Sequence, residues 1–129
     1  MRFIISARNV AFAAPPGMPV QDIHAGVFGK DGRFYYPLLT TGPLAPGGKP
    51  EQHLRLLRFD PGSTRVEDLG VPELTGFDEA KVKHTFFRGD KYKLDHIQGM
   101  AVGADGTLFM MDIYPQLNVV WFPGLTGKR

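Results

Sequence analysis

The sequence contains no cysteine among its 129 residues. This absence excludes disulfide bonds, a cysteine-ligated zinc ion and a thiol nucleophile. It does not identify a compartment, because proteins of oxidising and reducing compartments can both lack cysteine. A run of about 20 apolar residues, which a membrane-spanning helix needs, is missing too. Arg8 and Asn9 interrupt the apolar N-terminal stretch before it reaches the length of a signal-peptide core. We therefore expect a soluble chain without a signal peptide and without a membrane partner.

A dense run of positive charge is also missing. The 15 basic and 13 acidic residues give a net charge of +2, and the basic residues are scattered along the chain. The sequence therefore predicts no nucleic-acid partner. The most basic stretch, residues 81–93, contains Asp90 and is flanked by Asp78, Glu79 and Asp95, a mixture of charges that is typical of a solvated surface. Serine and cysteine nucleophile motifs, a phosphate-binding glycine loop and an HExxH helix are all absent.

Helical patterning is confined to a turn or two that begins at Asp78. The chain instead holds 16 glycines and 11 prolines, which favour short strands joined by many turns. These features predict an all-β fold built from antiparallel sheets.

One segment pattern occurs twice, at residues 24–36 and at residues 97–111. Each copy has a glycine, a small or apolar stretch, an Asp-Gly pair and then an apolar or aromatic run. The Asp-Gly pairs predict hairpin turns, because glycine takes the positive φ that tight connections require. They also assign a structural turn role to Asp31, Gly32, Asp105 and Gly106. Two hairpins of one design indicate an internal repeat.

Further strands follow each hairpin. Residues 53–60 and 64–69 predict two strands around a Pro-Gly turn, and residues 118–122 predict one strand after the second hairpin. The Asp-Gly pairs lie 74 positions apart (105 − 31), and insertions at 41–50 and 73–95 account for this distance. We therefore divide the chain into a leading strand within 1–15, a first unit at 23–70, an inserted connection at 71–95 and an incomplete second unit at 96–125 that lacks a fourth strand.

The stretch from Gln98 to Asp112, together with Asn118-Val-Val-Trp-Phe, resembles a blade of the NHL-repeat β-propellers. Such propellers are similar to the six-bladed gluconolactonase-like (SMP-30) and streptogramin-lyase-like proteins. Residues 56–61 followed by 66–70 resemble the outer half of such a blade. The resemblance implies four-stranded antiparallel blades, of which this chain holds about two. It departs from the streptogramin-lyase-like pattern at Ala104, where those blades usually carry proline.

An incomplete ring has consequences for partners. Open sheet faces and unpaired strand edges are costly in water. We therefore expect the chain to self-associate, to join a partner chain that completes the propeller, or to be a fragment of a larger propeller. Three copies of two blades would close a six-bladed ring.

The resemblance places a ligand site at the mouth of the central channel, where loops enter the innermost strands. His24 and His96 precede those strands, and each has an aspartate within two residues, Asp22 and Asp95. A neutral imidazole binds divalent metal ions or acts as a general base, and a nearby carboxylate can fix its tautomer. By resemblance, His24 and His96 are the catalytic and metal-ligating candidates. The ion would be Ca²⁺, Zn²⁺ or Mg²⁺.

Other polar and aromatic residues have simpler interpretations. Gln98 could point an amide into the channel, where it would bind a ligand or form structural hydrogen bonds. Asp112 ends a predicted strand, where this type of blade uses aspartate to bind backbone amides. His53 and His84 have no patterned neighbours and are expected at the surface. The strand aromatics are expected in the core; they are Tyr35, Tyr36, Phe109 and Trp121.

Two functions fit this sequence. The first is metal-assisted lactone hydrolysis or lyase chemistry at the channel mouth, on a small-molecule substrate. The second is a non-catalytic propeller scaffold that binds a protein or a carbohydrate through its loops. The first is the leading hypothesis, although a propeller fold alone does not rank it far above the second. The sequence does not establish that the chain is an enzyme.

Overall fold

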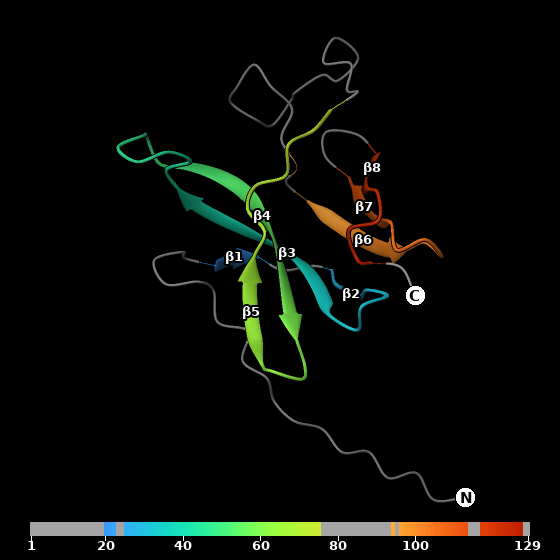
Figure 1. Ribbon diagram of the computed structural model, residues 1–129. Helices are drawn as coiled ribbons and strands as arrows, with labels where there is room; N and C mark the ends of the chain where they lie inside the picture. Colours follow the sequence, from blue (N-terminus) through green and yellow to red (C-terminus); the bar gives the residue numbers. More distant parts are fainter. Residues whose placement is uncertain (1–19, 23–24, 76–93, 95, 114–116, 128–129) are drawn as a thin grey trace, which may run out of the picture.

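The structure is a computed structural model that describes residues 20–22, 25–75, 94, 96–113 and 117–127. Every strand in this part of the chain pairs antiparallel and no helix is present, which confirms the predicted all-β class. The strands form two open sheets, the N-terminal sheet and the C-terminal sheet (Figure 1). No helix long and apolar enough to cross a membrane occurs in the described ranges.

The N-terminal sheet contains five strands. They are β1 (Val20–Asp22), β2 (Val27–Phe28), β3 (Phe34–Gly42), β4 (Glu51–Asp60) and β5 (Arg65–Asp68). Their order is β1-β3-β4-β5, and β2 also pairs with β3. Because β2 pairs with the start of β3 and β1 with its end, β1 and β2 lie on the same side of β3 and the sheet is four strands wide.

This sheet differs from the prediction in two places. It begins at Val20, three residues before the predicted start at 23, and β3 continues to Gly42 instead of ending near Tyr36. Pro37 lies inside β3, opposite Leu56. Proline has no N–H to donate to a ladder and usually interrupts one. In β3 the ladder with β4 continues past Pro37. The interruption lies on the opposite side of β3, where β2 pairs with residues 34–35, β1 pairs with residues 39–40, and neither strand pairs with residues 36–38.

The C-terminal sheet contains β6 (Ile97–Val102), β7 (Leu108–Asp112) and β8 (Asn118–Phe122), in that order. Its three strands match the three that the sequence predicts for this unit. The predicted leading strand within 1–15 lies outside the described residues. So do the helical turn at Asp78 and most of the predicted connection at 71–95. The parts of that connection that are described, residues 71–75 and 94, are neither strand nor helix.

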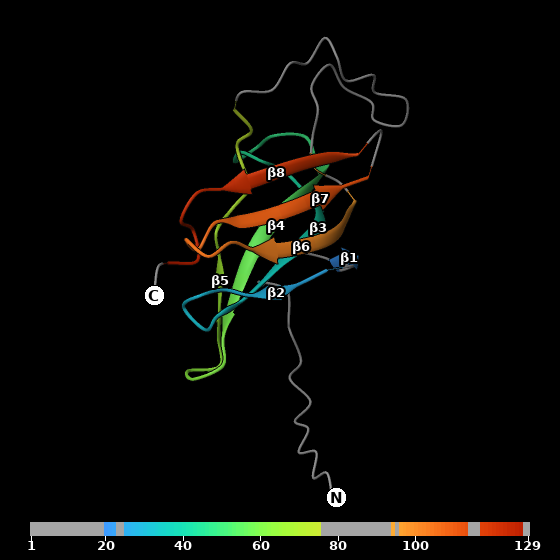
Figure 2. The same ribbon diagram turned by 90° about the vertical axis from the view of Figure 1, so that its right-hand side faces the viewer.

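The two sheets pack face to face, with β2 beside β6 (Figure 2). The core between them contains Tyr35 and Leu56 from the N-terminal sheet and Leu108 and Met110 from the C-terminal sheet. All four side chains are buried. Burial of apolar surface at this junction is the main interaction that holds the sheets together.

A second apolar cluster lies on the far face of the N-terminal sheet. It consists of Tyr36, Leu38, Leu57 and Phe59, with Phe34 packed against it. His53 is buried on this face too, opposite Thr40, so the prediction that His53 lies at the surface is wrong. The strand alternation of β4 turns it inward, which sequence spacing around a single histidine could not show.

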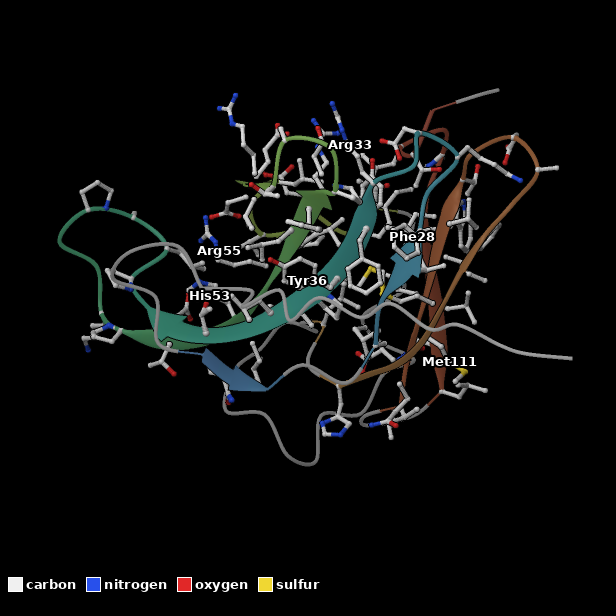
Figure 3. All side chains as sticks on the ribbon, turned by 90° about the horizontal axis from the view of Figure 1, so that it is seen from below. Phe28, Arg33, Tyr36, His53, Arg55 and Met111 are labelled. Atoms are coloured by element: carbon white, nitrogen blue, oxygen red, sulfur yellow. The ribbon has the colours of Figure 1, made fainter. Side chains whose placement is uncertain are left out.

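Polar groups beside this cluster tie β5 to the sheet. Arg55 lies beside His53 on β4 (Figure 3), with Nη1 3.5 Å from His53 Nε2. Its Nε donates to Asp68 Oδ2 at 2.9 Å. A second pair, Arg58 and Glu67, also joins β4 to β5, at 2.7 Å. The outer edge of the N-terminal sheet is therefore a short, charged strand.

Candidate functional site

Of the residues predicted for the channel mouth, the structure describes the side chains of His96 and Gln98. His96 immediately precedes β6, and its backbone N–H donates to Asp112 Oδ1 at 3.1 Å. The His96 carbonyl accepts from the Ile113 N–H at 3.3 Å. Asp112 is fully buried at the end of β7, and its carboxylate accepts the hydrogen bond from the backbone of His96, the residue that precedes β6. Gln98 is exposed on β6.

The rest of the predicted site is not placed. His24 and Asp95 lie outside the described residues. The backbone of Asp22 pairs with Leu39 in β1, and its side chain lies outside the description. Among the described residues, no group of three or more histidines, aspartates and glutamates is arranged to hold a metal ion. The geometry therefore gives the channel-mouth site one placed histidine, His96.

The two predicted hairpin turns have matching hydrogen bonds. Asp31 Oδ1 accepts from the Arg33 N–H, and Asp105 Oδ1 accepts from the Thr107 N–H, both at 3.0 Å. Gly32 has φ of 77° and Gly106 has φ of 82°, the left-handed region that glycine adopts without strain. The same bonds in both places support an internal repeat of one hairpin design.

Thr126, which the sequence analysis did not single out, connects these two hairpins. Its N–H and its Oγ1 both donate to the Gly106 carbonyl, at 3.0 and 2.8 Å. In the other direction, the Asp31 N–H donates to the Thr126 carbonyl at 2.9 Å, and the Lys30 N–H donates to Thr126 Oγ1 at 3.2 Å. Thr126 is fully buried. The segment after β8 therefore clips one sheet to the other. Its only sequence signal is the Pro-Gly pair that precedes it.

Tyr35 lies at the same junction. Its hydroxyl donates to Asp31 Oδ2 at 2.8 Å and lies 3.4 Å from the Leu125 carbonyl. Burial raises the pKa of the Tyr35 phenol above its usual value of 10.0; a hydrogen bond with Arg58 opposes this rise, and the Asp31 carboxylate adds to it. Burial also raises the pKa of Tyr36, with a smaller contribution from the charge of Asp68.

These pKa shifts predict instability at alkaline pH. Because the native state favours the neutral phenols, the unfolded chain loses these protons first. The stabilisation is complete below about pH 10 and falls as the pH rises through the native pKa values. We expect Tyr35→Phe to weaken this alkaline loss, as measured by urea midpoints between pH 8 and pH 11. The same slope in wild type and in the Tyr35→Phe, Tyr36→Phe double variant would contradict this account.

The C-terminal sheet has an exposed apolar face on the side away from the N-terminal sheet. Phe109 pairs with Trp121, and Met111 pairs with Val119. Their exposed fractions run from 36% for Phe109 to 61% for Trp121. The side chain of Met111 points away from the N-terminal sheet (Figure 3). On β6 the same face holds only small residues; they are Gly99 and Ala101. We call these six residues the outer face.

The prediction that Phe109 and Trp121 lie in the core is therefore wrong, whereas Tyr35 and Tyr36 are buried as expected. The reason is the number of covering layers. The N-terminal sheet has buried apolar clusters on both faces, and the C-terminal sheet has one covered face. Strand alternation alone gives the same expectation for both sheets.

The repeat shows which face of the N-terminal sheet corresponds to the outer face. Val27 pairs with Tyr35 four residues after Asp31, and Ala101 pairs with Phe109 four residues after Asp105. Tyr35 and Phe109 thus occupy the same place in the two units. Tyr35 is fully buried in the core between the sheets, whereas Phe109 is exposed. The outer face is therefore the counterpart of a face that a neighbouring sheet covers within this chain.

Comparison with known proteins reveals no relative. No protein-family model, no curated protein and no solved structure matches the chain. What the chain does is therefore inferred from its own side chains and their arrangement.

Proposed function

We propose that the chain is a pair of β-propeller blades that acts as a non-catalytic scaffold, completed by further sheets from other copies of the chain. The observation that supports this proposal is the correspondence between Tyr35 and Phe109. One unit of the repeat is covered at this position by a sheet, and the other unit presents an uncovered apolar face at the corresponding place.

The chemistry of the outer face favours a sheet as its occupant. It carries no charge and extends over three strands. Contiguous exposed apolar surface of this kind marks an interaction site on a soluble protein. A second apolar sheet would bury the whole face at once, at the spacing of packed sheets.

Self-association tests this proposal. We expect the purified chain to form a species heavier than its 14.3 kDa monomer in light scattering. Phe109→Lys should return it to the monomer, because a lysine there would be buried without a partner charge. Leu44→Lys is the matched control, since Leu44 is equally an exposed apolar residue but lies in the loop between β3 and β4. A wild-type monomer of native-like stability at every concentration would contradict the proposal.

The same sample also tests the second candidate function, which is metal-assisted lactone hydrolysis or lyase chemistry. It would use His96 at the start of β6, together with His24. Metal analysis of the light-scattering sample should then find a stoichiometric divalent ion that His96→Ala removes. That result would favour the enzyme, and a metal-free oligomer would favour the scaffold.

A further inference from the structure

The C-terminal sheet is one strand narrower than the N-terminal sheet. In the N-terminal sheet, Phe59 pairs with Phe34 on one side and with Val66 of β5 on the other. In the C-terminal sheet, Phe122 pairs with Leu108, the counterpart of Phe34. Within the part of the chain that the structure describes, no strand pairs with the other side of β8. The edge of β8 therefore occupies the position at which the first unit carries its fourth strand.

The two sheet edges are chemically opposite. Strand β5 is short and charged, with Arg65, Glu67 and Asp68 among its four residues. Strand β8 has the sequence Asn-Val-Val-Trp-Phe, with no charge and no proline. Its Val119 and Trp121 side chains are exposed. Charged residues, proline and short length are the features by which edge strands resist pairing with other chains. Strand β8 has five residues, one more than β5, and it contains neither a charged residue nor a proline.

A groove of about 240 Å³ runs beside β8. Its lining residues are Glu73, Leu74 and Thr75 on one side and Val119 to Pro123 on the other. Five consecutive residues line it, so the groove follows the strand and not one face of the sheet. Leu74 packs against the core between the sheets, which fixes the opposite wall. A walled groove along an open strand edge fits an extended peptide that adds to the sheet.

Two groups in the groove indicate the charge of such a peptide. Glu73 is exposed and forms no ion pair within the described residues. Trp121 presents an exposed indole in the same groove. A carboxylate and an indole both attract a lysine or arginine side chain, by charge and by cation–π interaction. An acidic strand such as β5 would be repelled by Glu73.

We propose that the β8 groove binds an extended peptide that pairs antiparallel with β8 as a fourth strand and places a basic side chain near Glu73 and Trp121. Main-chain hydrogen bonds to β8 supply the affinity, and the basic side chain supplies the preference. This site goes beyond the proposed scaffold, because it adds the open edge of β8, although the groove shares Val119 and Trp121 with the outer face.

Tryptophan fluorescence reports on this site directly, since Trp121 is the single tryptophan of the chain. The probe is a capped hexapeptide of alternating valine and lysine, compared with the same peptide carrying glutamate for lysine and with one carrying a central proline. We expect the lysine peptide to shift the Trp121 emission saturably. The glutamate peptide should bind roughly fivefold more weakly. The proline peptide, which cannot complete the ladder, should not bind measurably.

Two further measurements complete the test. Glu73→Lys should reverse the preference between the lysine and glutamate peptides, and because Glu73 is exposed this variant should remain folded. Hydrogen exchange of the β8 amides should slow when the lysine peptide is bound. Equal affinity for all three peptides, no binding by any of them, or unchanged β8 exchange would overturn the proposal.

The Phe109→Lys variant keeps this test separate from the proposed self-association. Phe109 lies on the outer face and does not line the groove. The variant should therefore bind the lysine peptide, even where it no longer self-associates. A wild-type monomer that binds the peptide would contradict the assembly and support the groove. An oligomer that binds no peptide would do the reverse.

Discussion

Gly106→Ala should reduce the free energy of unfolding by about 3 kcal/mol, measured by urea denaturation. Gly106 has φ of 82°, where an alanine costs about 1 to 2 kcal/mol. A Cβ at this position would also overlap the backbone carbonyl of Gly127. The overlap cannot be relieved by rotating a side chain, so the segment that carries Thr126 must move and lose its bonds to both hairpins.

Gly32→Ala is the matched control, because the two glycines occupy the same place in the repeated hairpin. Gly32 has φ of 77°, but no atom lies within 4 Å of the Cβ that alanine would add. It should cost only the backbone term of about 1 to 2 kcal/mol. The difference between the two variants measures how firmly residues 124–127 hold the hairpin. Equal losses would show that this segment moves aside without cost and does not clip the sheets together.

The parts of the fold that the sequence predicts well are those that local chemistry determines. Each Asp-Gly pair specifies its hairpin through contacts within a few residues, such as the bond from the Thr107 N–H to Asp105. The turn between β4 and β5 is local in the same way, with Asp60 Oδ1 accepting from the Gly62 N–H at 2.8 Å. Strands joined by such turns are therefore visible in the sequence.

The parts that the sequence does not predict depend on residues far apart in the chain. Pro37 predicts that β3 ends early, but the strand continues to Gly42 because its end pairs with β1. Thr126 contacts hairpins at Asp31 and Gly106, and nothing next to Thr126 in sequence indicates either contact. The exposure of Trp121 depends on whether another sheet covers β8, which alternation within β8 cannot reveal.

The candidate site follows the same distinction between local and distant contacts. The sequence identifies His96 through its place before an inner strand, and the structure adds its bond to the buried Asp112. A metal centre needs several ligands at once, and these would come from loops and units far apart in sequence. The outer face and the β8 groove, in contrast, are built within one sheet and its neighbouring segment, so their geometry supports specific proposals.

Tyr35→Ala should cost about 4 kcal/mol, because it removes a fully buried aromatic side chain at the junction of the two sheets. It also removes the hydroxyl that bonds to Asp31 beside the Thr126 clip. The loss should therefore be concentrated between the sheets. We expect the fluorescence of Trp121, which reports on the C-terminal sheet, to change at lower urea concentration than the far-ultraviolet circular dichroism of the whole chain. Non-coincident transitions of this kind show that a two-state description has failed.

Tyr36→Ala is the control that gives this prediction its meaning. Tyr36 is the same residue type, is also buried, and lies next to Tyr35 on β3, but it belongs to the cluster on the far face. Its truncation should cost a similar free energy while fluorescence and circular dichroism still change together, because the junction between the sheets stays intact. Separated transitions in Tyr36→Ala, or coincident ones in Tyr35→Ala, would mean that the sheets do not couple through Tyr35. The correspondence between Tyr35 and Phe109 would then no longer indicate what covers the outer face. If the face at Tyr35 contributes little to the coupling of the two sheets within the chain, the matching face gives no reason to expect strong association between copies.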